Sequence, residues 1–320
     1  MQLLDEFVSV LNGLADRKNC DVFVTGSNAK FLSRDIATEF GGRGDEVHMY
    51  PLSFSEFMSV YDGNRYDGWN EYIIYGGIPL VVLAETEEQK MAILDNLFRE
   101  TCISDIVKRN KIRNVGELEA LLDILSSAIG ALTNPNKLQK TFKSVNRSKI
   151  TATTITKYIE YLEDAFLIEE AVRFDIKGKS YIGTPLKYYF MDLGLRNARI
   201  NYRQIEITHS MENVIYNELR MRGFSVDVGN LTIVENGKDG KAVKKQLEVD
   251  FICNKGSKKY YIQSAYQLGT EEKLAQEIRP FLKIKDCFKK IVITSDTPKP
   301  CYTDEGILMM NVYDFLLNPE

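Results

Sequence analysis

The sequence predicts an α/β fold, and three observations lead to that prediction. Residues 22–25 form a short apolar run with the composition of a buried strand, which ends in small polar residues at positions 26–28. Helical apolar spacing follows at residues 29–40, and a second strand-like run, residues 46–50, ends at a proline. In the last third of the chain, residues 206–320, helix and strand patterns alternate again. Such alternation is typical of a sheet that is covered by helices.

Composition limits the number of domains and the classes of function. A chain of 320 residues is long for one compact core, so two or three domains are expected. Apolar residues make up 44% and charged residues 27% of the chain, as in ordinary globular proteins. The formal net charge of −4 argues against a protein that coats nucleic acid through its total charge, but it permits a local basic face.

The expected location is the cytoplasm, without a membrane partner. No apolar run reaches the roughly 18 residues of a membrane-spanning helix. Residues 1–13 lack the basic start of a signal peptide. The five cysteines include no CxxC pair and the chain has two histidines, so reduced thiols are expected rather than a zinc cluster.

The first 107 residues are predicted to place helices around the two strands. Apolar residues recur at helical spacing over residues 2–17. Ser53 and Glu56 have the spacing of a capping box, which predicts the start of another helix. A long helix is predicted over residues 90–107, with its apolar side chains on one face.

The polar residues after the first strand have two interpretations. The carboxyl end of a strand in an open α/β sheet faces the crevice where ligands bind. Ser27 and Asn28 lie at such a position, where they serve either as a helix cap alone or as a cap that also senses a phosphate group. Arg43, between glycines, is either a group that reaches a neighbour's nucleotide or a solvated turn residue.

A family resemblance starts from the segment between Thr25 and Phe57, TGSNAKFLSRDIATEFGGRGDEVHMYPLSFSEF. This segment resembles the second half of the ATPase module in a family of prokaryotic AAA-type ATPases. The stretches 75–79 and 187–195 resemble the same family, so the resemblance extends over nearly the whole chain. In this family a helical and winged-helix region and a nuclease-like domain follow the ATPase. The resemblance therefore implies a partial P-loop ATPase sheet with a helical lid over residues 1–107.

One part of the family's pattern is missing. The phosphate-binding loop G-x-x-x-x-G-K-[ST] and an acidic strand that ends in Asp-Glu should precede the resembling segment, and the chain contains neither. Tight ATP binding needs the loop amides, the lysine and a magnesium site. The resemblance thus implies ATP and Mg²⁺ only for a full-length relative, and no cofactor is expected for the chain as given.

Residues 108–205 predict a helical and winged-helix domain. A helix near residues 118–125, a lysine-rich segment and a threonine-capped helix at residues 151–162 precede two strands, and this order is the winged-helix plan. The second helix of that plan offers Thr, Ser and Lys to phosphates and base edges. The alternative is a winged helix that serves only as a spacer between proteins. The candidate DNA-binding residues are Lys149, Lys157, Lys177 and Lys179.

Residues 206–320 predict an α/β domain like the restriction endonucleases of the PD-(D/E)XK class. Glu212 on a helix and Asp250 on a strand occupy two positions of that pattern. The chemistry needs two or three acidic ligands for Mg²⁺ and a lysine that orients the attacking water. By the E-x-K spacing these last positions fall on Gln263 and Ala265. A neutral amide is a poor ligand beside carboxylates and alanine cannot position water, so we expect the fold without a metal and without nuclease activity.

These predictions favour a truncated or degenerate member of the ATPase family that binds nucleic acid or protein and is not catalytically competent alone. DNA, a second copy of the chain or another protein are the expected partners. Two alternatives stay open at this point. The chain is part of a full-length, DNA-binding ATPase that hydrolyses ATP, or it is a Mg²⁺-dependent DNA endonuclease that uses Glu212 and Asp250.

Overall fold

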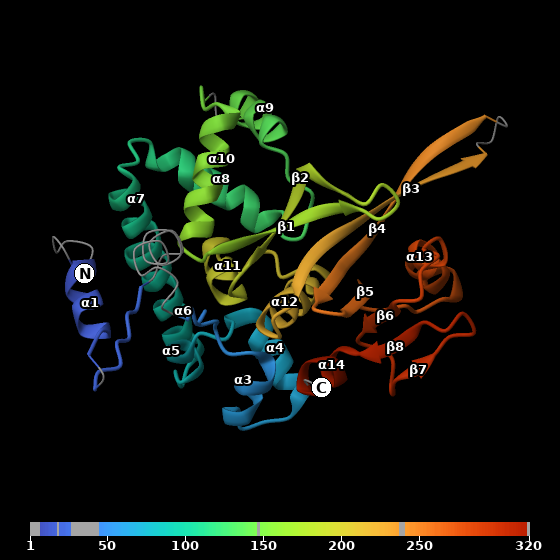
Figure 1. Ribbon diagram of the computed structural model, residues 1–320, viewed down its shortest axis with the longest axis horizontal. Helices are drawn as coiled ribbons and strands as arrows, with labels where there is room; N and C mark the ends of the chain where they lie inside the picture. Colours follow the sequence, from blue (N-terminus) through green and yellow to red (C-terminus); the bar gives the residue numbers. More distant parts are fainter. Residues whose placement is uncertain (1–6, 18, 27–44, 146–147, 237–240, 319–320) are drawn as a thin grey trace.

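The fold comes from a computed structural model that describes residues 7–17, 19–26, 45–145, 148–236 and 241–318 (Figure 1). The helices up to the first strand are α1 (Phe7–Ala15), α3 (Phe54–Val60), α4 (Arg65–Tyr75), α5 (Pro79–Val82), α6 (Glu87–Asn96), the π-helix η2 (Leu97–Ile103), α7 (Ser104–Asn110), α8 (Val115–Ser127), α9 (Pro135–Val145) and α10 (Ala152–Asp164). The later helices are α11 (Leu193–Arg199), α12 (Ile207–Met221), α13 (Glu271–Leu282) and α14 (Val312–Leu317). The strands are β1 (Ile168–Asp175), β2 (Ser180–Phe190), β3 (Ser225–Asn236), β4 (Ala242–Lys255), β5 (Lys258–Ser264), β6 (Lys289–Thr294), β7 (Cys301–Tyr302) and β8 (Leu308–Asn311).

One mixed sheet organises the described part of the chain. Its eight strands follow the order β2-β1-β3-β4-β5-β6-β8-β7. The pairs β1–β3, β5–β6 and β6–β8 are parallel, and the other neighbours are antiparallel. Helices lie around this sheet (Figure 1), so the predicted α/β class is confirmed. Within the described ranges, no helix has both the length and the apolar character needed to cross a membrane.

The β1–β2 hairpin, which was expected to be the wing of a separate domain, forms the edge of this same sheet. β1 pairs in parallel with β3 over Arg173–Asp175 and Val228–Asn230. The sheet therefore continues across the boundary predicted at residue 205. The division into residues 1–107, 108–205 and 206–320 stays a prediction, as do the winged-helix and nuclease-like descriptions of its last two parts.

Two apolar cores lie on opposite faces of the sheet. The larger core contains residues of α12 and of the helices α3 to α11, together with Ile291 and Ile293 of β6. The smaller core contains Val292, which lies between them in β6, and Phe281 of α13. Successive residues of β6 thus enter different cores, as the two-residue period of a strand requires. All four residues from Ile291 to Thr294 are buried, because both faces of this strand are covered.

The predicted helix starts are confirmed. The hydroxyl oxygen of Ser53 accepts the N–H of Glu56, and the carboxylate of Glu56 accepts the N–H of Ser53, which completes the capping box of α3. Thr151 caps α10 by accepting the N–H of Thr154. The helix predicted over residues 90–107 forms as three consecutive segments, α6, η2 and α7.

A buried carboxylate, Asp192, ties the helices to the end of β2. Its Oδ2 accepts the N–H of Gly77 at 2.8 Å, and its Oδ1 accepts the N–H of Leu195 at 3.1 Å. Burial raises the pKa of Asp192 to about 6, although these N–H groups act in the opposite direction. Gly77 and Asp192 belong to the two stretches, 75–79 and 187–195, that extend the family resemblance. We therefore ascribe a structural role to both stretches.

Two glycines make this junction possible. Gly76 has a φ of 76°, in the left-handed region that side chains rarely adopt. A Cβ atom on Gly194 would lie 2.0 Å from the carbonyl oxygen of Tyr75. No larger residue fits between these two backbones without moving one of them.

Two predicted strands do not form. Residues 22–25 and 46–50 have no regular secondary structure. Phe23 is 89% exposed and Met49 is 85% exposed, so these runs are not buried either. A strand needs hydrogen bonds to a neighbour and apolar surface to cover it, and neither run belongs to the described sheet. The predicted ATPase sheet is thus not formed by the described residues, and the helix predicted at residues 29–40 lies outside them.

Candidate functional site

A buried ion cluster lies between α12 and the sheet. The two carboxylates that the sequence singled out, Glu212 on α12 and Asp250 on β4, meet there around the ammonium group of Lys187, which β2 supplies. The Nζ atom of Lys187 lies 2.9 Å from Oε1 of Glu212 and 4.0 Å from Oδ1 of Asp250. It also lies 2.8 Å from Oε1 of Glu248 on β4. Three carboxylates thus converge on one buried cation, and these four residues are called the ion cluster below.

A β-bulge aims Asp250 into the ion cluster. β4 carries one more residue than β3 in the stretch where the two strands face each other. As a result Val249 and Ile252 enter the core under α13, whereas Phe251 enters the core on the α12 side. Asp250, between Val249 and Phe251, also points to the α12 side, where it meets Lys187. Bulges of this kind commonly re-aim side chains beside functional sites.

Hydrogen bonds hold the two acids of the predicted pair differently. The hydroxyl of Tyr189 donates to Oε1 of Glu212 at 2.6 Å. Oδ2 of Asp250 accepts the backbone N–H of Ser264 at 2.8 Å. The hydroxyl oxygen of Ser264 is itself buried and has no hydrogen-bond partner among the described residues. Glu212 is thus bonded by side chains, whereas Asp250 is bonded by the backbone N–H of a residue whose own hydroxyl is unpaired.

The charges in the ion cluster are not equivalent. Burial would raise the pKa of Glu212, but the charge of Lys187, the nearby imidazole of His209 and the hydroxyl of Tyr189 outweigh it and lower the pKa. Burial and the charge of Glu212 raise the pKa of Asp250 to about 8. Burial opposes the charge of Lys187, yet its carboxylate neighbours raise the pKa of the ammonium group. Lys187 thus favours the ionised form of Glu212, whereas burial and the charge of Glu212 disfavour ionisation of Asp250.

The remaining positions of the predicted nuclease pattern lie toward the other face of the sheet. The side chain of Gln263 donates to Glu277 of α13 at 3.2 Å, and its oxygen accepts the backbone N–H of Asp250 at 3.4 Å. Ala265 belongs to the core under α13. The structure therefore brings Glu212 and Asp250 together but does not place Gln263 or Ala265 beside Glu212.

Sequence reasoning missed Lys187 and Glu248. Lys187 precedes the aromatic residues 188–190 at the end of β2, and a lysine in such an apolar strand must be paired with an acid if it is buried. This pattern could have indicated a buried ion pair. It could not have identified the partner, because Glu212 lies 25 residues away in the sequence.

The residues present do not fit a bound Mg²⁺. This ion needs about six oxygen ligands at about 2.0–2.1 Å, and here the ammonium group of Lys187 stands where the three carboxylates converge. In the part of the chain that the structure describes, no group of three or more His, Cys, Asp or Glu side chains is arranged to hold a metal ion. The cluster is built as an ion-pair network.

The four predicted DNA-binding lysines lie on two parts of the surface. Lys149 is exposed between α9 and α10, and Lys157 is exposed on α10. Lys177 and Lys179 are exposed in the turn between β1 and β2. The Nζ atom of Lys177 donates to the carbonyl oxygen of Thr232 on β3 at 3.1 Å, so this turn lies beside the long β3–β4 hairpin (Figure 1).

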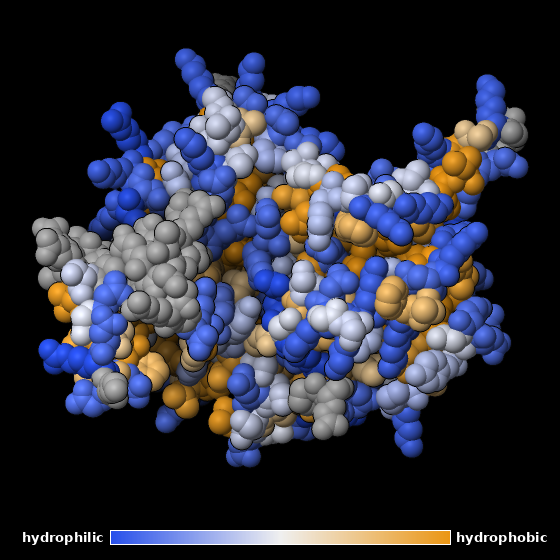
Figure 2. All heavy atoms as spheres, viewed as in Figure 1, coloured by the Kyte–Doolittle hydropathy of each residue, from blue (hydrophilic) through white to orange (hydrophobic). Residues whose placement is uncertain are grey.

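A groove follows the first turns of α10. The neighbouring helix α9 carries three further exposed lysines, at positions 137, 140 and 143, and Figure 2 shows hydrophilic side chains gathered over α9 and α10. Hydroxyl and ammonium groups at the amino end of a helix are suited to phosphate groups. The groove is lined by Pro135, Asn136, Ala152, Thr153, Thr156, Lys157, Glu160 and Thr184.

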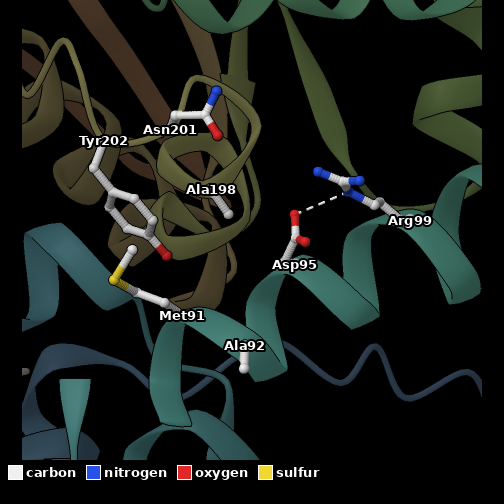
Figure 3. Close-up of a pocket in the computed structure, with 7 residues that line it drawn as sticks. All are labelled: Met91, Ala92, Asp95, Arg99, Ala198, Asn201 and Tyr202. Carbon is white, nitrogen blue, oxygen red and sulfur yellow. Dashed lines mark hydrogen bonds and ion pairs between the residues drawn. The ribbon is translucent and has the colours of Figure 1, made fainter. Parts of the chain in front are cut away.

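A second hollow lies between α6, η2 and the end of α11 (Figure 3). Asp95 and Arg99 form an ion pair at 3.0 Å on one side of it. On the other side Asn201 and Tyr202 have left-handed φ angles of 51° and 57°, which are uncommon outside glycine. The predicted nucleotide contacts Ser27, Asn28 and Arg43 lie outside the described residues. The hollow is lined by Met91, Ala92, Asp95, Arg99, Ala198, Asn201 and Tyr202.

Comparisons with known proteins place the chain in a family. A family model of an AAA domain matches residues 1–58, and a model of a domain of unknown function (DUF8612) matches residues 66–206. An uncharacterized protein of Haemophilus influenzae is 35% identical over 322 residues, which cover 99% of this chain and 76% of that protein. This chain belongs to the same family. The uncharacterized protein MJ1544 of Methanocaldococcus jannaschii, 31% identical over 97% of this chain and 68% of its own length, is a further relative in the family.

The AAA-type relationship predicted for the N-terminal residues is confirmed over residues 1–58 of this family member. Among solved structures, the crystal structure of protein VC1899 from Vibrio cholerae is similar over 88% of this chain and 63% of that chain, with 9% identity and a TM-score of 0.23. The chain therefore spans less than two thirds of that protein, and a likeness at this level supports no statement about fold or function.

Proposed function

We propose that the chain is a nucleic-acid-binding module without catalytic activity of its own. The observation that carries this proposal is the basic, threonine-rich surface at the start of α10. Thr153, Thr156 and Lys157 line the groove there, and Lys149 is exposed just before the helix. The whole chain has a net charge of −4, so a cluster of exposed lysines is a local feature that bulk composition does not explain.

The packing of α10 supports its role as the contacting helix. One face of the helix is buried, which leaves a polar face for a partner. In a winged-helix arrangement, the corresponding helix enters the major groove and its first turns approach base edges and phosphates. The buried face consists of Ile155, Tyr158, Ile159 and Leu162. The exposed face consists of Thr153, Thr156, Lys157 and Glu160.

The two ends of α10 differ in charge, which orients the proposed partner. Toward its carboxyl end α10 carries three acidic residues, Glu160, Glu163 and Asp164. A phosphate backbone is repelled by such an acidic end and attracted by the amino end with Lys149 and Lys157. We therefore place the nucleic acid over α9 and the amino end of α10.

The test is a double charge reversal, Lys149→Glu with Lys157→Glu. Binding to two unrelated duplexes should weaken alike, because phosphate binding is blind to sequence, and the salt slope should fall by about one for each phosphate that the variant no longer neutralises. Fluorescence anisotropy over a salt series measures both quantities. The matched control is Lys285→Glu with Lys299→Glu, an equal change of charge at exposed residues far along the chain. Unchanged binding by the first variant would favour the protein-spacer alternative.

A second candidate is that the chain is part of a longer protein that hydrolyses ATP. The AAA-domain match to residues 1–58 supports it, and so does the greater length of both relatives. In such a protein Ser27 and Asn28 would sense a phosphate group and Arg43 would reach a neighbour's nucleotide. We expect the chain as given to bind ATP no more tightly than about millimolar, because it lacks the phosphate-binding loop. Calorimetric titration with ATP and Mg²⁺ measures this, and an in-frame G-x-x-x-x-G-K-[ST] upstream of the Met1 codon would support the longer protein.

A further inference from the structure

The ion cluster gathers carboxylate groups around a single positive group, and that positive group is a side chain of the protein. Glu212, Asp250 and Lys187 are 7%, 7% and 4% exposed. The Nζ atom of Lys187 approaches Glu212 and Glu248 at hydrogen-bond distance, as expected for charge-assisted bonds. The ammonium group of Lys187 acts like a bound cation, because it neutralises carboxylates that come from both α12 and β4.

Three features limit what else can occupy this position. The ammonium group is tethered to β2, so it cannot diffuse away as a metal ion can. Its burial excludes bulk water, which strengthens each charge interaction. Ser264, whose backbone N–H donates to Asp250, is about nine-tenths buried, and its hydroxyl has no hydrogen-bond partner among the described residues. Carboxylate and hydroxyl oxygens are the ligands that hard divalent cations prefer.

We propose that Lys187 is the built-in cation of the ion cluster and that its ammonium group excludes a divalent metal from the position between Glu212, Glu248 and Asp250. The wild-type chain takes up no divalent ion there, and removal of the ammonium group turns the cluster into a divalent-cation site. The absence of metal chemistry then results from Lys187 and not from the neutral residue at position 263, whose side chain contacts α13.

The experiment compares the wild-type chain with Lys187→Ala in a titration with Mn²⁺, followed by the electron paramagnetic resonance signal of the free ion. We expect Lys187→Ala to bind one ion per chain with sub-millimolar affinity, and the wild type to bind none in that range. Without metal the variant buries carboxylates that lack a counter-charge, so its Tm should be lower than that of the wild type in EDTA and should rise on addition of Mn²⁺. The wild-type Tm should not respond.

Two controls show whether Mn²⁺ binds at the ion cluster or to acidic residues elsewhere on the chain. Lys187→Ala combined with Glu212→Gln removes one ligand and should lose the ion. Lys90→Ala removes another largely buried lysine, which is paired with the single acid Glu71, and should gain no ion.

The proposal can be tested whether or not Lys187→Ala folds in the absence of metal. If Lys187→Ala is unfolded in EDTA, refolding in Mn²⁺ supports the proposal, and failure to refold counts against it. Lys187→Ser also removes the ammonium group and leaves room for the ion, so a folded Lys187→Ser chain that binds no Mn²⁺ would overturn the proposal. Uptake of Mn²⁺ by the wild type at this cluster would overturn it as well.

Discussion

Two runs of almost the same composition have opposite fates in this chain. Residues 22–25 read Val-Phe-Val-Thr and residues 291–294 read Ile-Val-Ile-Thr, and both patterns indicate a buried strand. The second run is in β6, between β5 and β8, and is buried on both faces. The first run is irregular, and Phe23 is 89% exposed.

This difference shows that an apolar, β-branched run favours burial but does not determine which strand it pairs with. β6 pairs with strands from distant parts of the chain, and its side chains enter two cores. The described residues offer no neighbouring strand to residues 22–25. Exposed apolar residues on unpaired backbone are prone to associate. Phe23, Val47 and Met49 are therefore the surface at which we expect self-association.

The largest expected effect is a difference in stability between variants of the two runs. Ile293→Ala should lower the free energy of unfolding by about 3 kcal/mol, because it deletes fully buried methyl and methylene groups and leaves a cavity. Phe23→Ala removes an exposed side chain and should change that free energy by less than about 0.5 kcal/mol. Urea denaturation of both variants measures the contrast. Equal losses would mean that residues 22–25 are packed in solution.

A smaller loss of stability is expected where two backbones pack closely, at the contact between Gly194 and Tyr75. Gly194→Ala would place a methyl group against the carbonyl of Tyr75, and the resulting strain should cost about 2 kcal/mol. Gly183→Ala on β2 meets no atom within 4 Å and serves as the matched control, with a change within about 0.5 kcal/mol. Thermal unfolding compares the two. A neutral Gly194→Ala would show that the junction around Asp192 is loose.

The smallest expected effect is a change of stability with pH, which is due to Asp192 at the same junction. The pKa of Asp192 in the folded chain, about 6, is above its unfolded value, so the folded state holds the extra proton between pH 4 and 6. Its contribution to stability is present below pH 4 and is lost as the pH rises through about 6. Relative to Asp192→Asn, which has no proton to lose, the wild type should therefore lose about 1 kcal/mol of stability from pH 5 to pH 6.

Urea denaturation at several pH values measures this difference. Asp304→Asn, at an exposed carboxylate, is the control for a general change of charge. A difference between wild type and Asp192→Asn that stays constant from pH 4 to pH 6 would contradict the assignment.

The candidate site was predictable only in part. Helix and strand patterns identified Glu212 and Asp250 as partners, and the structure brings them together at one buried position. The E-x-K spacing led to Gln263 and Ala265, which lie toward α13 because strand alternation turns them to that face. The lysine of the cluster instead comes from β2, through a sheet that joins the hairpin to the later strands.

Local patterns by themselves determined the α/β class, the capped starts of α3 and α10, and the amphipathic faces of the helices. These properties depend on residues within a few positions of one another, through hydrogen bonds and periodic burial that the sequence displays. Only the tertiary structure decided which apolar runs became strands, and which cation neutralised Glu212 and Asp250. Both outcomes depend on groups that are distant in sequence, whose pairing is set by the order of strands in the sheet and by the low dielectric of its interior.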